Sequence, residues 1–496
     1  MGFAADTINF LAVAFVVVIG AIVAVAVVLF FIDRFQTHDA IRRNYPVLGR
    51  FRSIFSALGE FFRQYFFAMD REELPFNRAQ REWIHRAGSG KGNTIAFGST
   101  RNLNVTGTPI FVNAAFPPMD DEFAQSQSLV IGAETKHPFH AKSFFNLSGM
   151  SLGAISKPAV TTLSKGAKEA GIWMNRGEGG LSEYHLKGGA DIVFQIGTAK
   201  FGVRDEDGNL SDEKLRTVAA HECVRMFEIK LAQGAKPGKG GILPGAKVTE
   251  EIANIRGLKV GQDGISPNRH REVNNWDELL DMIDRIRNVT GKPVGIKTVM
   301  GAENAIGDLF DAITKRGATS APDFITMDGG EGGTGAAPMP LIDLVGMSIR
   351  EALPLLVDMR DAAGLKDRVR IVASGKLAHP GDVAWALAAG ADFVTSARGF
   401  MFALGCIQAL KCNKNTCPTG ITTHDPRFQK GLVVSDKYLK VAAYAKNVVK
   451  EVEVISHSVG VAEPRLLNRN HVRIMQESGR STPMSVLYPG ASAPTA

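Results

Sequence analysis

Short β-rich segments that end in glycine, serine or other polar residues alternate with helical patterns from about residue 140 onward. This alternation limits the possible folds more than any other feature, because it is typical of parallel βα units. The segments leave room for eight strands, which predicts an α/β fold, a (β/α)8 TIM barrel with insertions. A doubly wound sheet is the alternative, but no G-x-G-x-x-G opens a helix after an early strand. The segments are SFFNLSG, IWMNRGEGG, DIVFQIG, PVGIKT, DFITMDGG, RIVASGK and DFVTSARG.

An uninterrupted apolar segment, FLAVAFVVVIGAIVAVAVVLFFI, covers the 23 residues 10–32. About 20 helical residues cross the hydrocarbon core of a bilayer, so we expect one N-terminal transmembrane helix at residues 8–32. A cleaved signal peptide is the alternative, but it favours a basic start and a shorter apolar stretch, and only Asp6 is charged before this one. Arginines follow the segment, and positive charge stays on the cytoplasmic side. We therefore predict a single-pass protein of the cell membrane with a cytoplasmic catalytic domain.

Residues 33–92 form a basic juxtamembrane region, with 11 Lys and Arg against 7 Asp and Glu, and so carry +4 of the formal net charge of +7. Such a surplus beside a membrane indicates lipid headgroups as partners and not nucleic acid. Apolar residues recur at helical spacing opposite Arg50, Arg52 and Arg63, which predicts an amphipathic helix. It either lies in the membrane interface or packs against the catalytic domain. The apolar positions are Phe51, Ile54, Phe55, Leu58, Phe62, Tyr65 and Phe66.

The rest of the chain divides by composition. Residues 93–140 are expected to lead into the barrel, residues 141–430 to form it, and residues 431–496 to add a C-terminal helical extension and tail. SGKLAHPGD (374–382) and TSARGF (395–400) follow the last two predicted strands. In TIM barrels these two loops commonly bind phosphate through backbone N–H groups, although such glycines can also simply make tight turns. The candidate phosphate ligands are Ser374, Gly375, Ala397 and Arg398.

Three of the four cysteines lie within twelve positions, in CIQALKCNKNTC. Four cysteines in a chain of this length do not make a disulfide framework. The spacing C-x5-C-x4-C is unusual for zinc, which favours four ligands and closer pairs. Iron–sulfur clusters accept thiolates along one loop, often before a proline such as Pro418. Structural cysteines are the alternative, and Cys223, far upstream, is expected to be a small buried hydrophobe.

Six longer segments, in order along the chain, carry a family resemblance: GMSLGAIS (149–156), RGEGG (176–180), QIGTAKFGV (195–203), KLAQGAKPGKGGILPGAKV (230–248), DGGEGGTGAAP (328–338) and CNKNTCPTGITTHDP (412–426). Over roughly residues 125–430 the chain resembles the FMN-binding synthase domain of glutamate synthases, and most closely short stand-alone proteins of that kind. The resemblance implies an FMN cofactor. It also implies a 3Fe–4S cluster on Cys406, Cys412 and Cys417.

The resemblance further implies a set of flavin contacts. Met150 and Ser151 would present backbone to the flavin edge, beside Gly149, while Gln195 and Lys297 would face the ring. A cation near the pyrimidine half of the ring stabilises the reduced flavin; for Lys297 the alternative is a surface lysine that ends a strand. Glycines let backbone approach a cofactor closely. These further contacts are Gly329, Gly330, Gly332 and Gly333, with Glu331 among them, for which simple solvation is the alternative.

For the substrate, Lys236 and Arg256 match family residues that bind the carboxylates of 2-oxoglutarate. Gln233 and Glu178 match polar neighbours of the reacting centre, where positioning and charge drive the reaction. Two residues of the same segment depart from the long enzymes of the family. Lys239 stands where those enzymes typically have Glu, and Ile242 where they have Gln, so the exact 2-oxo acid and the amine stay open.

The expected protein is thus an FMN and iron–sulfur oxidoreductase that reductively aminates a 2-oxo acid by hydride transfer, most simply 2-oxoglutarate and ammonia to glutamate. The long enzymes begin with a glutaminase domain whose nucleophile is an N-terminal cysteine, whereas here residue 2 is Gly. Ammonia or an amine, and electrons from ferredoxin or a membrane redox protein, are therefore expected from outside. One alternative is an N-substituted glutamate synthase. The other is a membrane-anchored electron-transfer subunit; only this second alternative is disfavoured by the presence of Lys236, Arg256 and Glu178.

Overall fold

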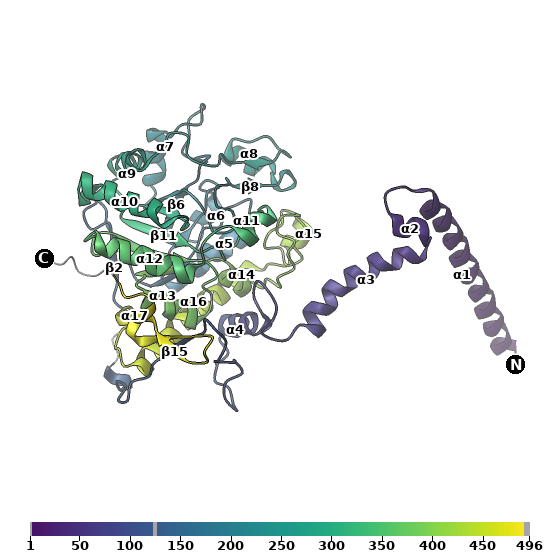
Figure 1. Ribbon diagram of the computed structural model, residues 1–496. Coiled ribbons are helices and arrows are strands. Elements are labelled where there is room, and N and C mark those ends of the chain that lie inside the picture. Colours follow the sequence, from purple (N-terminus) through teal and green to yellow (C-terminus); the bar gives the residue numbers. More distant parts are fainter. Residues whose placement is uncertain (1, 123–125, 491–496) are drawn as a thin grey trace. The chain divides into compact units, whose positions relative to one another are not determined.

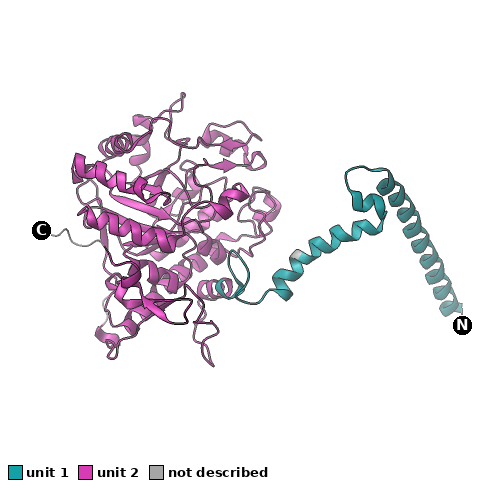
Figure 2. Cartoon of the chain, viewed as in Figure 1, with its two compact units in different colours: residues 1–80 teal, residues 81–496 magenta. Residues whose placement is uncertain are grey.

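The computed structural model describes residues 2–122 and 126–490. The chain divides into two compact units, residues 1–80 and residues 81–496 (Figure 2). The first unit is helical, and its helix α1 is long and apolar enough to cross a membrane, as the sequence predicts. Its elements are α1 (Gly2–Phe35), α2 (Ala40–Asn44), α3 (Leu48–Phe62) and the π-helical turn η1 (Arg63–Phe67), and α4 (Arg78–Gly88) lies at the division.

Eight parallel strands of the second unit close into a barrel, which confirms the predicted fold (Figure 1). Each of the seven segments singled out from the sequence contains one strand. The remaining strand, β7, reads VRMFEIK, and its three charged residues hide the apolar run. In order around the barrel the strands are β4 (Phe145–Leu147), β5 (Met174–Asn175), β6 (Ile192–Ile196), β7 (Val224–Lys230), β10 (Val294–Thr298), β11 (Phe324–Asp328), β12 (Arg370–Ser374) and β13 (Phe393–Ser396).

Helices follow the strands and cover the barrel. Local signals set their ends: the Ser156 side chain accepts a hydrogen bond from Ala159 N at the start of α5, and Gly171 ends that helix in the left-handed region at φ 68°. These helices are α5 (Lys157–Ala170), α6 (Glu183–Leu186), α7 (Asp212–Ala219), α9 (Trp276–Thr290), α10 (Glu303–Arg316), α12 (Ile349–Ala362), α13 (Pro380–Ala389), α14 (Arg398–Leu404) and α16 (Val434–Val459).

Insertions and short elements complete the unit. After β7 come β8 (Ile242–Leu243), η3 (Gly245–Lys247), α8 (Glu250–Arg256) and β9 (Gly264–Ile265). The short helix η4 (Ala318–Ser320) comes after β10, and α11 (Met339–Leu344) comes after β11. The loop of residues 405–425, called the cysteine loop because it contains Cys406, Cys412 and Cys417, leads from α14 to α15 (Pro426–Gln429). The remaining elements are β1 (Pro109–Phe111), η2 (Asp120–Glu122), η5 (Pro464–Leu466), η6 (Arg469–His471), β14 (Val472–Met475), β15 (Ser481–Pro483) and α17 (Met484–Leu487).

A hydrophobic cluster fills the end of the barrel where the strands begin. The antiparallel hairpin of β2 (Leu129–Ile131) and β3 (Phe139–Ala141) contributes apolar side chains to it. Fully burying one large apolar side chain stabilises a fold by about 1.5–3 kcal/mol. The cluster thus makes this end of the barrel a packed core; its members are Ile131, Phe139, Ala141, Trp173, Val193, Met226, Phe324, Val372 and Phe393.

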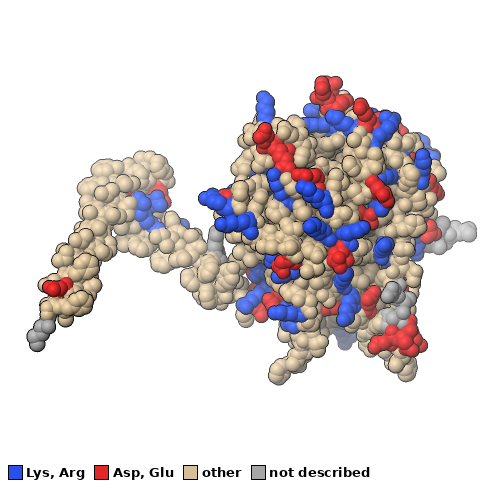
Figure 3. Space-filling view, turned by 180° about the vertical axis from the view of Figure 1, so that it is seen from behind, with Lys and Arg blue, Asp and Glu red and all other residues tan. Residues whose placement is uncertain are grey.

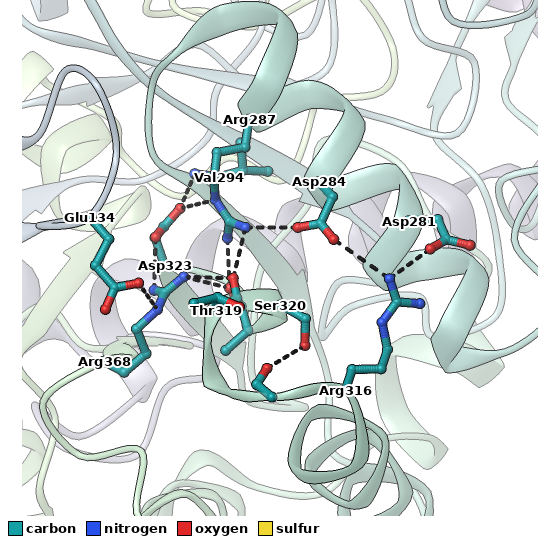
Figure 4. Close-up of polar contacts among 12 residues, drawn as sticks. Glu134, Asp281, Asp284, Arg287, Val294, Arg316, Thr319, Ser320, Asp323 and Arg368 are labelled. Carbon is teal, nitrogen blue, oxygen red and sulfur yellow. Dashed lines mark hydrogen bonds and ion pairs between the residues drawn. The ribbon is translucent and has the colours of Figure 1, made fainter.

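Ion pairs tie the same end of the barrel together (Figure 4). The fully buried Asp323, just before β11, accepts hydrogen bonds from Arg287 Nε at 3.2 Å, Arg368 Nη1 at 2.8 Å and Val294 N at 2.7 Å. Its carboxylate therefore joins α9 and the starts of three neighbouring strands. In TIM barrels this end of the barrel provides stability, and the active site lies at the other end, at the carboxyl ends of the strands.

Candidate active site

A pocket opens at the carboxyl ends of the barrel strands. Its empty space, which includes solvent at the open mouth, is about 1000 Å³. Twelve of the predicted site residues line it: Gly149, Met150, Ser151, Glu178, Gln195, Gln233, Lys236, Arg256, Gly333, Ala397, Arg398 and Cys412. The structure thus brings together residues that lie up to 263 positions apart, from Gly149 to Cys412.

Nine predicted residues do not line this pocket. Lys297 lines a small neighbouring cavity in the barrel core. The other eight are Gly329, Gly330, Glu331, Gly332, Ser374, Gly375, Cys406 and Cys417. Residues 329–332 share a loop with the lining residue Gly333, and Cys406 and Cys417 share one with Cys412, whereas Ser374 and Gly375 lie at the end of β12 and directly after it.

The two predicted phosphate loops follow β12 and β13, the seventh and eighth strands of the barrel. Gly375, just after β12, has φ 119°, and a Cβ there would lie 2.8 Å from Gly329 N, so only glycine lets this loop approach the loop after β11 so closely. Arg398 Nη2 donates to the Glu331 carbonyl oxygen at 2.5 Å. Burial lowers the pKa of Arg398 to about 10, yet it stays charged at neutral pH. A cation beside glycine-rich backbone suits a phosphate group.

Asp328, at the end of β11, fixes the loops around the pocket, although the sequence did not single it out. Its buried carboxylate accepts from Gly234 N and from Ser374 Oγ, each at 2.8 Å, and lies 3.6 Å from Lys297 Nζ. Glu331 also has a structural role, because its Oε2 accepts a hydrogen bond from Ile349 N at 3.0 Å and so holds this loop against the start of α12. The charge of Lys297 is therefore partly balanced before any ligand binds.

The substrate residues form a charged group on one wall of the pocket. Lys236 is buried and donates to the Ala336 carbonyl oxygen at 2.9 Å. Arg256 Nη2 donates to Leu152 O at 2.7 Å and to Ser151 Oγ at 3.1 Å. The buried Arg256 Nε has no hydrogen-bond partner among the described residues. A buried donor without a partner is costly, so this side chain is suited to an incoming anion.

Burial and charge shift the pKa values of this group. Burial lowers the pKa of Lys236 to about 8, with a further contribution from nearby Lys230, and burial lowers that of Arg256 to about 10. Burial alone would raise the pKa of Glu178, but the charges of Lys230, Lys236 and Arg256 outweigh it, and the net pKa is lowered. Glu178 therefore stays ionised at neutral pH. Sequence reasoning missed Lys230, whose Nζ lies 3.2 Å from Glu178 Oε1 and donates to Gln233 Oε1 at 2.5 Å.

Glu228, on the strand that the sequence did not reveal, organises the floor of the pocket. Its buried carboxylate accepts from Gln195 Nε2 at 2.6 Å, Asn175 Nδ2 at 2.8 Å and Thr326 Oγ1 at 2.7 Å. Because the Gln195 amide nitrogen is held in this way, its side-chain oxygen is the polar atom left for a ligand. A charged residue inside a barrel strand is the signal that could have revealed Glu228.

The cysteine loop adjoins this pocket, and Cys412 lines it. Within the loop Gln408, Leu410 and Asn415 all have φ between 54° and 58°. Such left-handed conformations are strained for residues other than glycine and concentrate at functional sites. Lys247, buried in the pocket wall, donates to the carbonyl oxygens of Ala154 at 2.5 Å and Cys412 at 3.3 Å. A buried cation thus lies against this loop.

The three thiols of the loop differ in their environments. Burial raises the pKa of Cys406 to about 12 and also raises that of Cys412. Burial acts in the same direction on Cys417, but hydrogen bonds from Thr419 and Thr422 outweigh it and lower its pKa. Among the described residues, no group of three or more His, Cys, Asp or Glu side chains is arranged as a metal site. The donor set itself, three thiols on one loop beside a buried ammonium, suits a negatively charged iron–sulfur cluster.

A TIM barrel with a charged pocket at the carboxyl ends of its strands is typical of enzymes that act on small molecules. A family profile described as "Conserved region in glutamate synthase" matches residues 110–462. The chain therefore belongs to the glutamate synthase family, and it is a glutamate synthase-like oxidoreductase.

Three relatives illustrate this membership. The glutamate synthase large subunit-like protein YerD of Bacillus subtilis is 41% identical over 517 residues, covering 96% of this chain and 97% of that protein. A glutamate synthase large subunit-like protein of Rhizobium meliloti is 32% identical over 67% of this chain and 75% of its own. The archaeal glutamate synthase (NADPH) of Methanocaldococcus jannaschii is 34% identical over 66% of this chain, but the match spans only 61% of that enzyme.

Proposed function

We propose that this enzyme converts a 2-oxo acid and an amine into an amino acid, most simply 2-oxoglutarate and ammonia into glutamate. The observation that carries the proposal is the convergence of Lys236, Arg256 and Glu178 on one pocket. Two largely buried cations suit the two carboxylates of a dicarboxylic acid, since charge-assisted hydrogen bonds are strong where water is excluded. The name of the archaeal relative, a glutamate synthase, agrees with this reaction.

The two cations have donors to spare for a dicarboxylate. An ammonium has three N–H donors, and Ala336 accepts one of those of Lys236, so the others can reach a carboxylate. The partnerless Nε of Arg256 offers the second contact. These two anchors would fix the keto carbon in one orientation, which is how an enzyme lowers the entropic part of a reaction barrier.

Glu178 is the proposed partner of the amine. Its ionised carboxylate can accept an N–H from ammonium and take the proton that must leave before nitrogen attacks the keto carbon. Condensation then releases water, and reduction of the imine consumes one hydride and one proton. Gln233, held by Lys230, would present its amide to the same centre.

FMN is the proposed cofactor; when bound in its reduced form it supplies the hydride. The backbone of Gly149, Met150 and Ser151, together with the Gln195 side-chain oxygen, would hold the ring. The loops that contain Ser374, Gly375, Ala397, Arg398 and residues 329–333 would hold the phosphate end. Lys297 would then favour the reduced ring, although less than an unpaired cation would, because it lies close to Asp328.

A 3Fe–4S cluster on Cys406, Cys412 and Cys417 is proposed as the second cofactor; when bound it supplies single electrons. Its support is the donor set and the position of Cys412 in the pocket wall. An external one-electron donor, such as ferredoxin or a membrane redox protein, would then feed the enzyme. Helix α1 is the proposed single-pass anchor in the cell membrane, and the arginines after it favour a cytoplasmic catalytic domain.

One observation supports a second candidate, an N-substituted glutamate synthase. Ile242 lines the pocket, where the long enzymes of the family have a polar residue, whereas Lys239 is exposed and does not line it. An apolar side chain at this place suits an amine that carries an alkyl group. An electron-transfer subunit without a substrate would not need the buried cations Lys236 and Arg256, so this alternative is disfavoured.

The test is anaerobic. Reduced protein is titrated with 2-oxoglutarate and other 2-oxo acids, with ammonia or methylamine, while the flavin absorbance is followed. Lys236→Met should slow flavin reoxidation by 2-oxoglutarate at least a hundredfold and leave the flavin spectrum unchanged, because the carboxylate loses its anchor. Lys239→Met is the matched control and should react like the original enzyme.

The outcomes separate the candidates. Faster reoxidation with methylamine than with ammonia would favour the N-substituted product. Reoxidation that is unchanged in Lys236→Met would mean that the acid binds elsewhere, and an inert reduced flavin with every acid and amine pair would contradict the proposed function.

A further inference from the structure

Helix α3 and the π-helical turn η1 carry a continuous apolar face that the first unit leaves exposed. At 100° per residue the members of this face within α3 lie on one side of the helix, with Arg52 and Ser53 on the other. In η1 the rings of Tyr65 and Phe66 continue the face, with centroids 4.8 Å from Phe61 and 5.6 Å from Phe62. Exposed apolar surface of this extent marks an interaction site. The face consists of Phe51, Ile54, Phe55, Leu58, Phe61, Phe62, Tyr65 and Phe66, which are 40–68% exposed.

A buried ion pair fixes α3 to the end of α1. The fully buried Asp33 accepts from Arg50 Nε at 2.8 Å, Arg50 Nη2 at 2.7 Å and Val47 N at 3.0 Å. The Gln36 side chain closes the bend, because its Nε2 donates to the carbonyl oxygens of Asp33 and Asp39 and its Oε1 accepts from Asp39 N. The apolar face of α3 is thus separated from the apolar helix α1 only by the short bend at residues 36–47.

The composition around this face matches a lipid surface. Phenylalanine, tyrosine and leucine on one side and arginine on the other are typical of helices that lie in a membrane interface. The exposed Arg34 and Arg43 add positive charge at the bend, which complements anionic headgroups. Figure 3 shows the helical unit as largely uncharged, with Lys and Arg gathered near the bend.

We propose that residues 48–67 are a lipid-binding element that lies in the interface of the membrane crossed by α1, with the aromatic face toward the acyl chains and Arg52 and Arg63 among anionic headgroups. The inference rests on the proposed membrane anchor but not on the proposed reaction. The bend at Asp33 would set the depth at which the helix meets the bilayer.

Photocrosslinking of the full-length protein tests this. The photoreactive residue p-benzoylphenylalanine replaces Phe55, on the apolar face, or Ser53, on the opposite face, in protein reconstituted into vesicles of phosphatidylcholine and phosphatidylglycerol. The same replacement at Val18 reports on α1. After illumination, mass spectrometry should find lipid adducts at Phe55 at least tenfold more often than at Ser53, and adducts at Val18. Bound flavin, measured in each variant, checks that the protein is folded.

Three results would overturn the proposal. Crosslinks from Phe55 to peptides of residues 81–490 would mean that the face packs on the catalytic unit. Equal lipid labelling at Phe55 and Ser53 would mean that the helix has no preferred face toward the bilayer. Absence of lipid adducts at Val18 would remove the anchor on which the element depends.

Discussion

At the scale of the residue, the enzyme buries positively charged side chains in its pocket wall, which costs free energy because the charges lose water. Lys236, Lys247 and Arg256 are all buried in the pocket wall, and burial lowers the pKa of each, to about 8 for the two lysines. Each cation held in this way is poorly solvated, so an anionic ligand gains more from it than from a surface lysine. Buried cations of this kind suit the anionic substrate proposed above.

The pKa of Lys236 leads to a pH prediction. Its ammonium is charged below about pH 8 and loses the charge as the pH rises through that value, so 2-oxoglutarate should bind more weakly in alkaline solution. If only the charged form binds, Kd rises about fivefold between pH 8 and pH 9. Equilibrium titration of the oxidised enzyme, followed by the perturbation of flavin absorbance, measures this.

Lys236→Arg is the control for this pH dependence, because arginine keeps its charge throughout the range. The bend in Kd near pH 8 should disappear in this variant. A bend that persists would assign the titration to Lys247, the other lysine of the pocket with a pKa of about 8.

At the scale of the element, the strands and loops divide the work. The strands place Gln195 at the pocket and Glu228 and Asp328 behind its lining at fixed register, and the segments after the strands bring Lys236 and Arg256. Glu228 shows how a strand serves the site: one carboxylate holds side chains from β5, β6 and β11. The cysteine loop is different, because it is irregular, strained and set against the pocket by Lys247.

The cysteine loop yields an element-scale prediction. Cys412→Ser should remove iron and the electron paramagnetic resonance signal of the cluster, because one of three thiolate ligands is lost. FMN should remain, since the predicted flavin contacts are on other loops. Turnover with a ferredoxin-type donor should fall at least a hundredfold, while dithionite still reduces the flavin.

Cys223→Ser, far from the loop in sequence, is the matched control and should keep iron and turnover. Full donor-driven turnover by an iron-free Cys412→Ser protein would instead assign the three thiols to packing.

At the scale of the whole molecule, the chain joins two units with different surfaces. Residues 81–496 form the barrel with its own core, and residues 1–80 form helices with few buried apolar side chains. The first unit therefore has little core of its own, as expected for a segment whose partner is lipid. The catalytic unit should not need it for folding.

Two deletions test this division. Removing residues 1–35 takes away α1 but leaves α3, so the protein should still bind membranes, and alkaline carbonate should now extract it. Removing residues 1–70 should give a soluble protein. Both should retain FMN in the stoichiometry of the full chain, measured from the absorbance of pure protein. Loss of flavin on either deletion would show that the N-terminal unit is part of the catalytic fold.

The sequence alone predicted the barrel, because alternating segments with polar ends can bury their apolar residues in few ways. It likewise predicted helix α1, since 23 consecutive apolar residues are typical of a membrane-spanning helix, and it placed the two candidate phosphate loops after the last two strands. It missed β7, because Arg225, Glu228 and Lys230 interrupt the apolar pattern that reveals a strand.

Only the tertiary structure decided which polar residues act together. Glu228 and Asp328 look like ordinary strand carboxylates in sequence, and their bonds to residues up to 98 positions away arise only when the barrel closes. The lowered pKa values of Lys236 and Arg256 have the same origin, because burial depends on the packing of distant loops. Local patterns specify elements, whereas a charged pocket is a property of how the elements meet.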